Sequence, residues 1–327
     1  MSDRQLLREI WNKLSSCSEV AILTHKSPDG DAVGSVLAMK MALEGAGVKT
    51  RLYNRHEVPL VYRFLPGWEE IEIVDELDPH KLPRCILVLD ASDFGRVSLF
   101  ENAPEDTTVV LIDHHRPREP FGDLVFVDTS SASTGELVLE LLEANGVEIT
   151  PEIAIALYTA VFTDTGGFRY PNTSAKALYA GYKLASYGAD PTVVAFNVYS
   201  NYPGNRHRLL GLALNTLGWS DDGLVAWMEV TLEMFEATGT KAEDTEDFVD
   251  FPRSIKGVEV ALFFRERLIG GVKVSLRSKS WVNVAEIAAV FGGGGHKNAA
   301  GCEIDAPLEE AKRLVKTEVF KAIEAGR

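Results

Sequence analysis

Cysteine is scarce in this sequence, and the few cysteines form no recognisable pattern. The chain of 327 residues contains three, Cys17, Cys85 and Cys302, and none belongs to a CxxC pair. Such wide spacing argues against a disulfide framework and against a zinc site built from cysteine thiolates. It fits a reducing compartment, in which each cysteine serves as a small apolar side chain.

Long apolar runs are also missing. The longest lies near IAIALYTAVF, well short of the roughly 20 residues that cross a bilayer. The first residues, MSDRQLLREIWNKLSS, lack the basic start and the apolar stretch of a signal peptide. We therefore expect a soluble cytoplasmic protein with no membrane partner.

Positive charge is the third shortage. The chain has 33 Lys and Arg residues against 48 Asp and Glu residues, which gives a net charge of −15. Such a surface repels long duplex nucleic acid. A small anionic substrate stays compatible with this balance, provided that metal ions and a few arginines concentrate positive charge locally.

The pattern that is present indicates two domains. The length and a hydrophobic content of 46% are enough for two packed cores. We predict a first domain of residues 1–188, a helical connector of residues 189–217 and a smaller second domain of residues 218–327. Pro191 and the pair Pro203-Gly204 interrupt the helical pattern of the connector.

The first domain alternates strand-like apolar runs with helical patterns. This alternation predicts an α/β fold with a parallel sheet and helices on both faces. The second domain reads as a smaller α+β unit. The expected strands of the first domain are 20–24, 49–53, 84–89, 109–112 and 124–127, with helices 34–44, 133–145, 151–162 and 174–187; the second domain has strands 225–231, 258–264 and 271–276, with helices 284–291 and 308–325.

Ionisable residues gather at the points where the predicted strands end. The carboxyl ends of parallel strands meet at one edge of an open α/β sheet, where ligands bind. We therefore expect one crevice to collect these side chains. They are His25, Asp29 and Asp31 after the first strand, Asp90 and Asp93 after 84–89, Asp113, His114 and His115 after 109–112, and Asp164 after helix 151–162.

So many carboxylates in one place repel each other unless cations neutralise them. Mixed His and Asp ligands suit Mn²⁺, Mg²⁺ or Fe²⁺ better than a thiolate-preferring ion. The set is large enough for two ions that share a carboxylate, and two ions roughly 3.5–4 Å apart can clamp a phosphoryl group. The sequence therefore favours a dinuclear metal site.

Each of these residues taken alone also has an ordinary structural explanation. Asp29-Gly30-Asp31 suits a turn, Asp90 suits a helix cap, and His114 is as well explained by a structural hydrogen bond. Only their joint position at the strand ends favours metal binding over these explanations.

A second signal is the stretch FGGGGHKNAAGCEI, which begins at Phe291. Gly293, Gly294 and Gly295 would expose backbone N–H groups and let a phosphate approach closely. His296 adds a further donor, so we expect a loop that contacts an anion. A flexible turn after helix 284–291 is the plainer explanation for a glycine run by itself, and the P-loop spacing is absent.

Two arginines of the second domain suit the same task. Arg253 and Arg277 each precede a serine near a predicted strand end. A guanidinium can grip a terminal phosphate with two parallel hydrogen bonds. Either residue also suits a solvated surface charge, and for Arg253 the two explanations carry about equal weight.

The motifs together resemble those of a known family. THKSPDGDAVGS, LDASD, DHH and FTDTG follow one another as in the DHH phosphoesterase superfamily, and SLRSK with FGGGGHKNAAG resembles its DHH-associated C-terminal domain. The resemblance covers nearly the whole chain. With no added sensor or nucleic-acid domain in these residues, it is strongest to the group of bifunctional oligoribonucleases and adenosine 3′,5′-bisphosphate phosphatases.

This resemblance implies roles for the residues at matching positions. His25, Asp29 and Asp90 would hold one Mn²⁺, and Asp31, Asp90, His114 and Asp164 the other, with Mg²⁺ or Co²⁺ as substitutes. Asp113 and His115 would support His114 or reach the phosphate as catalytic residues. Gly293, Gly294, Gly295, His296, Arg277 and Arg253 would contact the substrate.

The implied activity is hydrolysis of dinucleotides to pentanucleotides and of nucleotide bisphosphates by a hydroxide that bridges two metal ions. Alternatives are hydrolysis of linear or cyclic dinucleotide signals, RecJ-like digestion of longer single strands, and polyphosphate hydrolysis. A non-catalytic nucleotide sensor is an alternative of a different class. The assembly state stays open, with a homodimer as one option.

Overall fold

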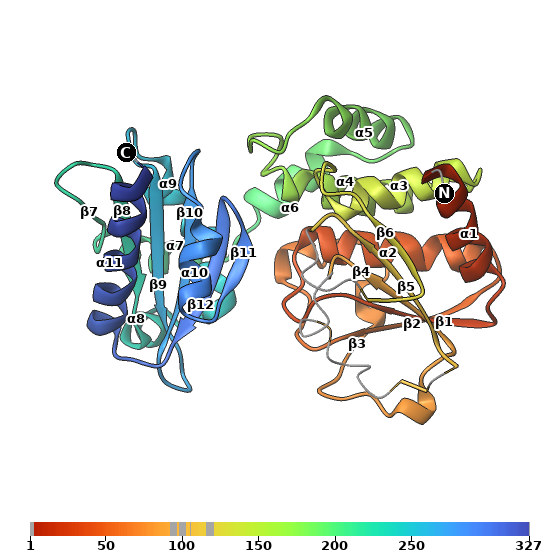
Figure 1. Cartoon of the computed structure of the whole chain (residues 1–327), viewed down its shortest axis with the longest axis horizontal. Coiled ribbons are helices and arrows are strands. Elements are labelled where there is room, and N and C mark those ends of the chain that lie inside the picture. Colours follow the sequence, from red (N-terminus) through yellow and green to blue (C-terminus); the bar gives the residue numbers. More distant parts are fainter. Residues whose placement is uncertain (1–2, 92–96, 98–102, 105, 116–120, 327) are drawn as a thin grey trace. The chain divides into compact units, whose positions relative to one another are not determined.

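The computed structural model describes residues 3–91, 97, 103–104, 106–115 and 121–326, so the predicted site residue Asp93 lies outside the described part. The chain divides into two compact units, Met1–Asn201 and Tyr202–Arg327 (Figure 1). The residues predicted as a connector are shared between them. Helix α6 (Pro191–Tyr199) belongs to the first unit and α7 (Gly204–Leu214) to the second.

The first unit is built on a six-stranded sheet of order β3-β2-β1-β4-β5-β6. Every described pairing in it is parallel. The predicted α/β fold with a parallel sheet is thereby confirmed. The strands are β1 (Glu19–Leu23), β2 (Lys49–Asn54), β3 (Ile71–Ile73), β4 (Cys85–Leu89), β5 (Thr108–Asp113) and β6 (Leu124–Val127).

Both faces of this sheet are buried, which explains why its strands read as continuous apolar runs. Successive residues of a strand point to opposite faces. Ile22 of β1 therefore joins the core under the α-helices, whereas Leu23 joins a second core with Leu82 and Val97 on the other face. The helices of the unit are α1 (Asp3–Ser15), α2 (Gly30–Gly45), α3 (Thr134–Ala144), α4 (Pro151–Asp164), α5 (Ala175–Ser186) and α6, with 3₁₀ turns η1 (Leu60–Tyr62), η2 (Trp68–Glu70) and η3 (Pro79–Lys81).

Helices α2 and α4 pack closely because Gly34, which has no side chain, lies where their backbones meet. A Cβ atom on Gly34 would lie 2.3 Å from the carbonyl oxygen of Ala156, which is well inside van der Waals contact. Glycine is required for this approach. The close packing matters for the site, because α2 begins next to Asp29 and α4 ends at Asp164.

The second unit contains a mixed sheet of order β11-β12-β10-β9-β8-β7. Val260 and Leu262 of β9 face a core with α10 and α11, while Ala261 and Phe263 face a core with α7. The elements are α7, β7 (Gly218–Trp219), β8 (Val225–Val230), α8 (Leu232–Thr238), η6 (Ala242–Thr245), α9 (Asp250–Ser254), β9 (Val260–Glu266), β10 (Val272–Ser278), α10 (Val284–Val290), β11 (Gly294–His296), β12 (Ala299–Ile304) and α11 (Leu308–Gly326).

The glycine run differs from the expected loop. Gly294 to His296 form the edge strand β11, which pairs with β12. A Cβ atom on Gly293 would lie 2.2 Å from the Gly301 carbonyl oxygen, and one on Gly295 would lie 2.4 Å from that of Ala299. At least these two glycines therefore have a structural reason, namely close pairing of the two strands.

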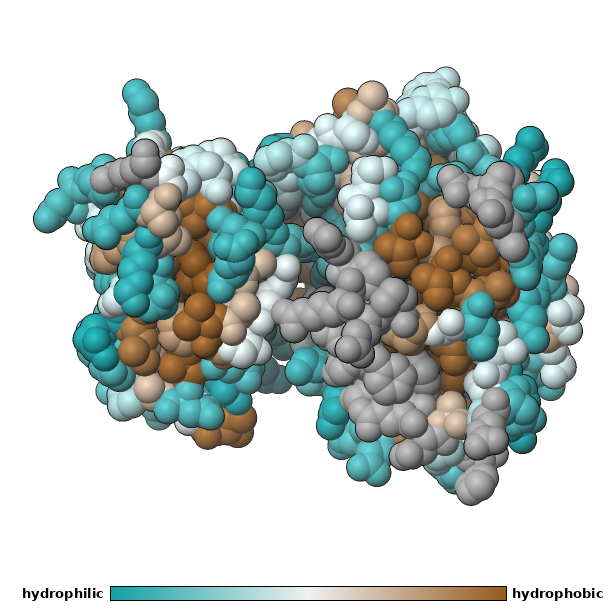
Figure 2. Space-filling model, in the orientation of Figure 1, coloured by the Kyte–Doolittle hydropathy of each residue, from teal (hydrophilic) through white to brown (hydrophobic). Residues whose placement is uncertain are grey.

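Hydrophilic residues cover much of the visible face of each unit, and each face also shows hydrophobic patches (Figure 2). Among the described residues, no helix combines the length and the apolar character that a membrane crossing requires.

Candidate metal centre

The predicted metal ligands lie at the point where the strand order reverses. From β1 the chain moves outward to β2 and β3, and then returns to place β4 on the other side of β1. Open α/β sheets bind ligands at the carboxyl ends of such strands. His25 and Asp29 follow β1, Asp90 follows β4, and Asp113 ends β5.

Asp90 occupies the centre of the site in an unusual backbone conformation. Its φ is 59°, in the left-handed region that few residues other than glycine adopt. Its carboxylate is buried and presents a different oxygen to each side. Oδ2 lies 3.4 Å from Nε2 of His25, and Oδ1 lies 3.6 Å from Nε2 of His114.

The first cluster consists of His25, Asp29 and Asp90. Asp29 has two functions here that use different oxygens. Its Oδ1 accepts hydrogen bonds from the backbone N–H groups of Asp31 and Ala32 and so caps helix α2. Its Oδ2 lies 3.8 Å from Nε2 of His25. Asp29 is therefore a helix cap, where the sequence by itself suggested a turn, and its second oxygen stays available for a ligand role.

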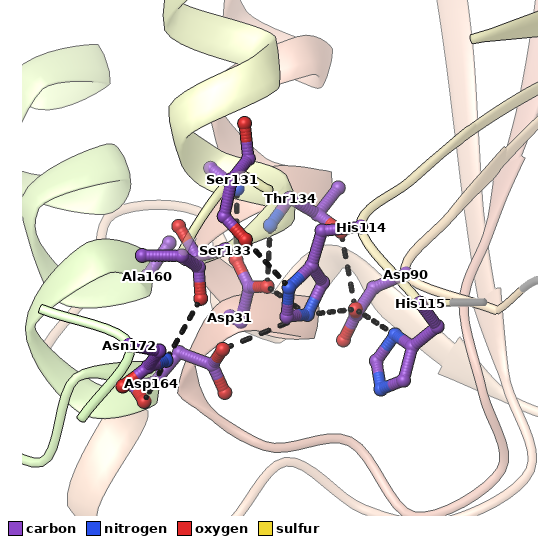
Figure 3. A network of polar contacts seen from close by, with 12 residues as sticks. Asp31, Asp90, His114, His115, Ser131, Ser133, Thr134, Ala160, Asp164 and Asn172 are labelled. Carbon is purple, nitrogen blue, oxygen red and sulfur yellow. Dashed lines mark hydrogen bonds and ion pairs between the residues drawn. The ribbon is translucent and has the colours of Figure 1, made fainter. Parts of the chain in front are cut away.

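The second cluster surrounds the Nε2 atom of His114 (Figure 3). Three carboxylate oxygens lie at similar distances from this atom: Oδ2 of Asp31 at 3.7 Å, Oδ1 of Asp90 at 3.6 Å and Oδ2 of Asp164 at 3.6 Å. On the other side of the ring, Nδ1 lies 3.4 Å from the carbonyl oxygen of Ser131. A carbonyl only accepts, which favours the tautomer with the proton on Nδ1 and a lone pair on Nε2.

The structure distinguishes the two adjacent histidines, which the sequence could not do. His114 is buried and points into the second cluster. His115 is partly exposed, and its Nδ1 lies 2.8 Å from Oδ1 of Asp113, which also accepts the His115 backbone N–H. Asp113 is fully buried and fixes the orientation of the His115 ring from the protein interior.

The pKa values show how poorly the carboxylates tolerate each other without a cation. Burial, together with the charges of Asp90 and Asp164, raises the pKa of Asp31 well above its usual range. Burial raises the pKa of Asp164 to about 7, although His114 opposes this. A bound cation would take the place of these protons.

The pKa values of two imidazoles are raised as well, but by neighbouring carboxylates and against the effect of burial. Burial alone would lower the pKa of His25, but Asp29 and Asp90 raise it to about 9. In the same way, Asp113 and Asp90 outweigh burial and raise the pKa of His115 to about 11.

The donor set fits divalent cations. The imidazole–carboxylate separations within the two clusters run from 3.4 to 3.8 Å, which is too long for good hydrogen bonds. Two ligands that bind one ion at about 2.1 Å lie roughly 3–3.5 Å apart. Hard oxygen donors and imidazoles suit Mn²⁺ and Mg²⁺ alike. The arrangement therefore fits a divalent cation but does not distinguish between these two ions.

Sequence reasoning missed the residues that hold these ligands. Thr134 and Gly135, at the start of α3, donate their backbone N–H groups to the two oxygens of Asp31 at 2.7 and 2.8 Å. The motif Ser133-x-x-Glu136 marks a helix N-terminus and was the available signal. Nothing in the sequence tells which carboxylate the helix start meets.

The substrate residues predicted in the second unit are brought partly together. Arg277 of β10 pairs with Ala299 of β12, and Ala299 pairs with His296 of β11. Residues directly opposite each other share one face of a sheet, so Arg277 and His296 stand in one row on one face. Arg253 lies on α9, where its guanidinium is 3.3 Å from Asp250. Substrate contact by these residues stays a prediction.

Comparisons with known proteins agree with the family resemblance of the motifs. The DHH family N-terminal domain matches residues 19–161, and the DHHA1 domain matches residues 224–324. The chain is 35% identical to the bifunctional oligoribonuclease and PAP phosphatase NrnA of Thermus thermophilus, over 95% of this chain and 96% of the relative. It is 28% identical to the protein of that name from Bacillus subtilis, over 94% and 96%.

A solved structure, an exopolyphosphatase-related protein from Bacteroides fragilis, superimposes with a TM-score of 0.89 at 28% identity and covers 97% of this chain and 96% of that one. The fold, the clustered carboxylates and imidazoles, and these matches define a metal-dependent phosphoesterase. The chain belongs to the DHH family and carries a DHHA1 domain, as its motifs predict.

Proposed function

We propose that this enzyme hydrolyses short oligonucleotides to mononucleotides, and adenosine 3′,5′-bisphosphate to AMP and phosphate. The relatives from Thermus thermophilus and Bacillus subtilis are named for these two activities. The observation that carries the proposal is the position of Asp90, whose two oxygens face two separate clusters. Two cations that share a carboxylate form a recurring arrangement in phosphoryl hydrolysis.

The two clusters support one assignment of residues to the cations. His25, Asp29 and Asp90 would hold one, and Asp31, Asp90, His114 and Asp164 the other. We infer Mn²⁺ as the ion, with Mg²⁺ and Co²⁺ as substitutes, from the resemblance of the motifs to the DHH family; the mixed imidazole and carboxylate donors are compatible with this choice. When bound, the ions would lower the pKa of water and neutralise charge that develops on the phosphoryl group.

The remaining polar residues act through their own positions. Asp113 orients His115 and, together with Asp90, raises the pKa of its ring, so His115 is suited to bind the phosphoryl group or to protonate the leaving oxygen. In the second unit, Arg277 and His296 offer donors from one row of a sheet to a nucleotide phosphate. Arg253, already beside Asp250, is the weaker candidate for this contact.

Product analysis tests the proposal. The purified enzyme is given a 5′-labelled trinucleotide, adenosine 3′,5′-bisphosphate, a cyclic dinucleotide and a long single strand, each with Mn²⁺, Mg²⁺ or Co²⁺. We expect mononucleotides from the first substrate and phosphate from the second, with the fastest turnover in Mn²⁺. Binding without turnover of either substrate would indicate a nucleotide sensor, and preference for the long strand would indicate a RecJ-like exonuclease.

Polyphosphate is included as a second candidate substrate for one specific reason. The similar structure from Bacteroides fragilis is described as exopolyphosphatase-related. Faster release of phosphate from polyphosphate than from the nucleotide substrates would replace our proposal with this activity.

A further inference from the structure

The start of helix α3 contacts both clusters through one uncharged residue. The backbone N–H of Thr134 donates to Oδ2 of Asp31 at 2.7 Å, and its hydroxyl donates to Oδ1 of Asp90 at 3.1 Å (Figure 3). The Thr134 side chain has no exposed surface. One residue thus touches a carboxylate that belongs to the second cluster and the carboxylate that faces both clusters.

The helix does not need the Thr134 hydroxyl for its own capping. Ser133 is the N-cap residue of α3, and its side chain accepts the N–H of Glu136. The hydroxyl of Thr134 is therefore available to point outward from the helix, and its hydrogen goes to Asp90. An ordinary structural role in the helix does not account for this contact.

Close approach of α3 is built into the adjacent residue. A Cβ atom on Gly135 would lie 2.4 Å from Cβ of Ala160 and 3.4 Å from Oδ1 of Asp31. The helix start consequently reaches Asp31 only because position 135 has no side chain. The Gly135 N–H then donates to that carboxylate at 2.8 Å.

Asp90 depends on its surroundings for both its backbone conformation and the orientation of its carboxylate. Its left-handed φ of 59° persists only where the surroundings fix it. The Thr134 hydroxyl bonds to Oδ1, the oxygen on the His114 side, and this leaves Oδ2 directed to His25. A rotation of the carboxylate would break this division of its oxygens between the clusters.

We propose that Thr134 is a positioning residue that makes Asp90 a shared ligand, so that the two metal sites fill as a coupled pair. The inference rests on the dinuclear centre proposed above. It goes further by assigning the coupling of the two ions to one hydroxyl group. Groups that support metal ligands typically change metal affinity by about 10- to 100-fold.

The experiment compares Thr134→Val, which keeps the shape and removes the hydroxyl, with Thr134→Ser, which keeps the hydroxyl. Stepwise Mn²⁺ binding is measured by calorimetry, and coupling between the ions by low-temperature electron paramagnetic resonance. We expect Thr134→Val to bind the second ion about 10- to 100-fold more weakly. With one equivalent of Mn²⁺ added, this variant should therefore show the signal of single, uncoupled ions. Thr134→Ser should keep the parent affinity and the coupled signal.

Thr159→Val is the matched control. Thr159 is equally buried, but its hydroxyl donates to the Ile155 carbonyl within its own helix. This variant should bind both ions as the parent does. Thr134→Ala provides a second test if valine strains the start of α3.

The outcomes separate the inference from the proposed function. A parent enzyme that binds fewer than two ions contradicts the dinuclear centre itself. A parent that binds two ions, with Thr134→Val or Thr134→Ala variants that bind and couple them equally well, overturns the role of Thr134 alone. Failure of both variants to fold while Thr134→Ser folds would assign the residue to the stability of the fold and also overturn the inference.

Discussion

The two units of this protein use their sheets in opposite ways. In the first unit, carboxylates and imidazoles from several parallel strands converge on the carboxyl edge of the sheet. In the second unit, Arg277 and His296 stand in one row across antiparallel strands, with Ala299 between them. The first arrangement concentrates negative charge that cations can neutralise, and the second offers donors to an anion.

This contrast teaches that metal binding and substrate binding should be separable by mutation. Changes in the first unit should alter metal occupancy or the chemical step. Changes in the second unit should alter the affinity for substrate and leave the metal in place. The following five experiments test this division, from the largest expected effect to the smallest.

Replacement of Asp90 by alanine should have the largest effect, because both clusters lose an oxygen. We expect turnover to fall by more than about 100-fold, which exceeds the usual loss for groups that only support ligands. Metal content, measured by elemental analysis after gel filtration, should fall together with activity. Substantial Mn²⁺-dependent activity in this variant would show that Asp90 is not shared.

The first cluster, which contains His25, should bind its cation more tightly as the pH rises. The pKa of this residue is raised to about 9 in the metal-free protein, so a cation must displace its proton at pH 7. Apparent affinity should rise about tenfold per pH unit between pH 7 and 9, about 100-fold in all, and then level off. Titrations with Mn²⁺ at several pH values measure this slope, and a flat profile contradicts it.

The same shift affects the stability of the metal-free fold, with a sign that can be checked. The folded pKa of His25 lies above its ordinary value of 6.5. The folded state therefore binds more protons than the unfolded state in this range, and its stabilising contribution is complete below pH 6.5. It is lost as the pH rises to about 9, which thermal unfolding in the presence of a chelator would show.

Replacement of Asp113 by asparagine should affect the chemical step more than the metal. The buried Asp113 carboxylate holds Nδ1 of His115 and raises its pKa. We expect the pKa of His115 to fall in this variant and kcat to decrease about 10- to 100-fold, while metal content is kept. NMR titration of labelled histidine gives the pKa, and an unchanged value would remove Asp113 from this role.

Replacement of His296 by alanine should have the smallest effect and should test the second unit. Loss of one hydrogen bond to a charged phosphate raises KM by about tenfold or somewhat more. Metal content and the stability of β11 should stay at parent values, since the strand pairs through its backbone. Loss of metal in this variant would break the division between the two units.

Much of the first unit could be predicted because its strands are buried on both faces. Strands such as Cys85–Leu89 are continuous apolar runs, and these runs gave the sheet within one or two residues. The edge strand Ile71–Ile73 is short and partly exposed, so its sequence carries no comparable signal. The strand Gly294–His296 was expected to be a loop because it consists mainly of glycine.

The site was predictable only as far as strand ends determine it. Convergence of Asp31, Asp90 and His114 follows from topology, and the structure brings them together. The support of Asp31 by Thr134 links positions 103 residues apart, and no local pattern encodes such a contact. The left-handed backbone of Asp90 was equally hidden, since an ordinary aspartate after a strand gives no sign of strain.

The return of the chain from β3 to β4 has a consequence for folding. Strands β2 and β3 lie between His25 and Asp90 in the sequence. The two residues therefore become neighbours only after β4 has paired with β1. A nascent or partly folded chain therefore offers no complete pocket to an ion. Divalent cations should stabilise only molecules with a finished sheet, so the ion that equips the enzyme for catalysis also selects for correctly assembled copies.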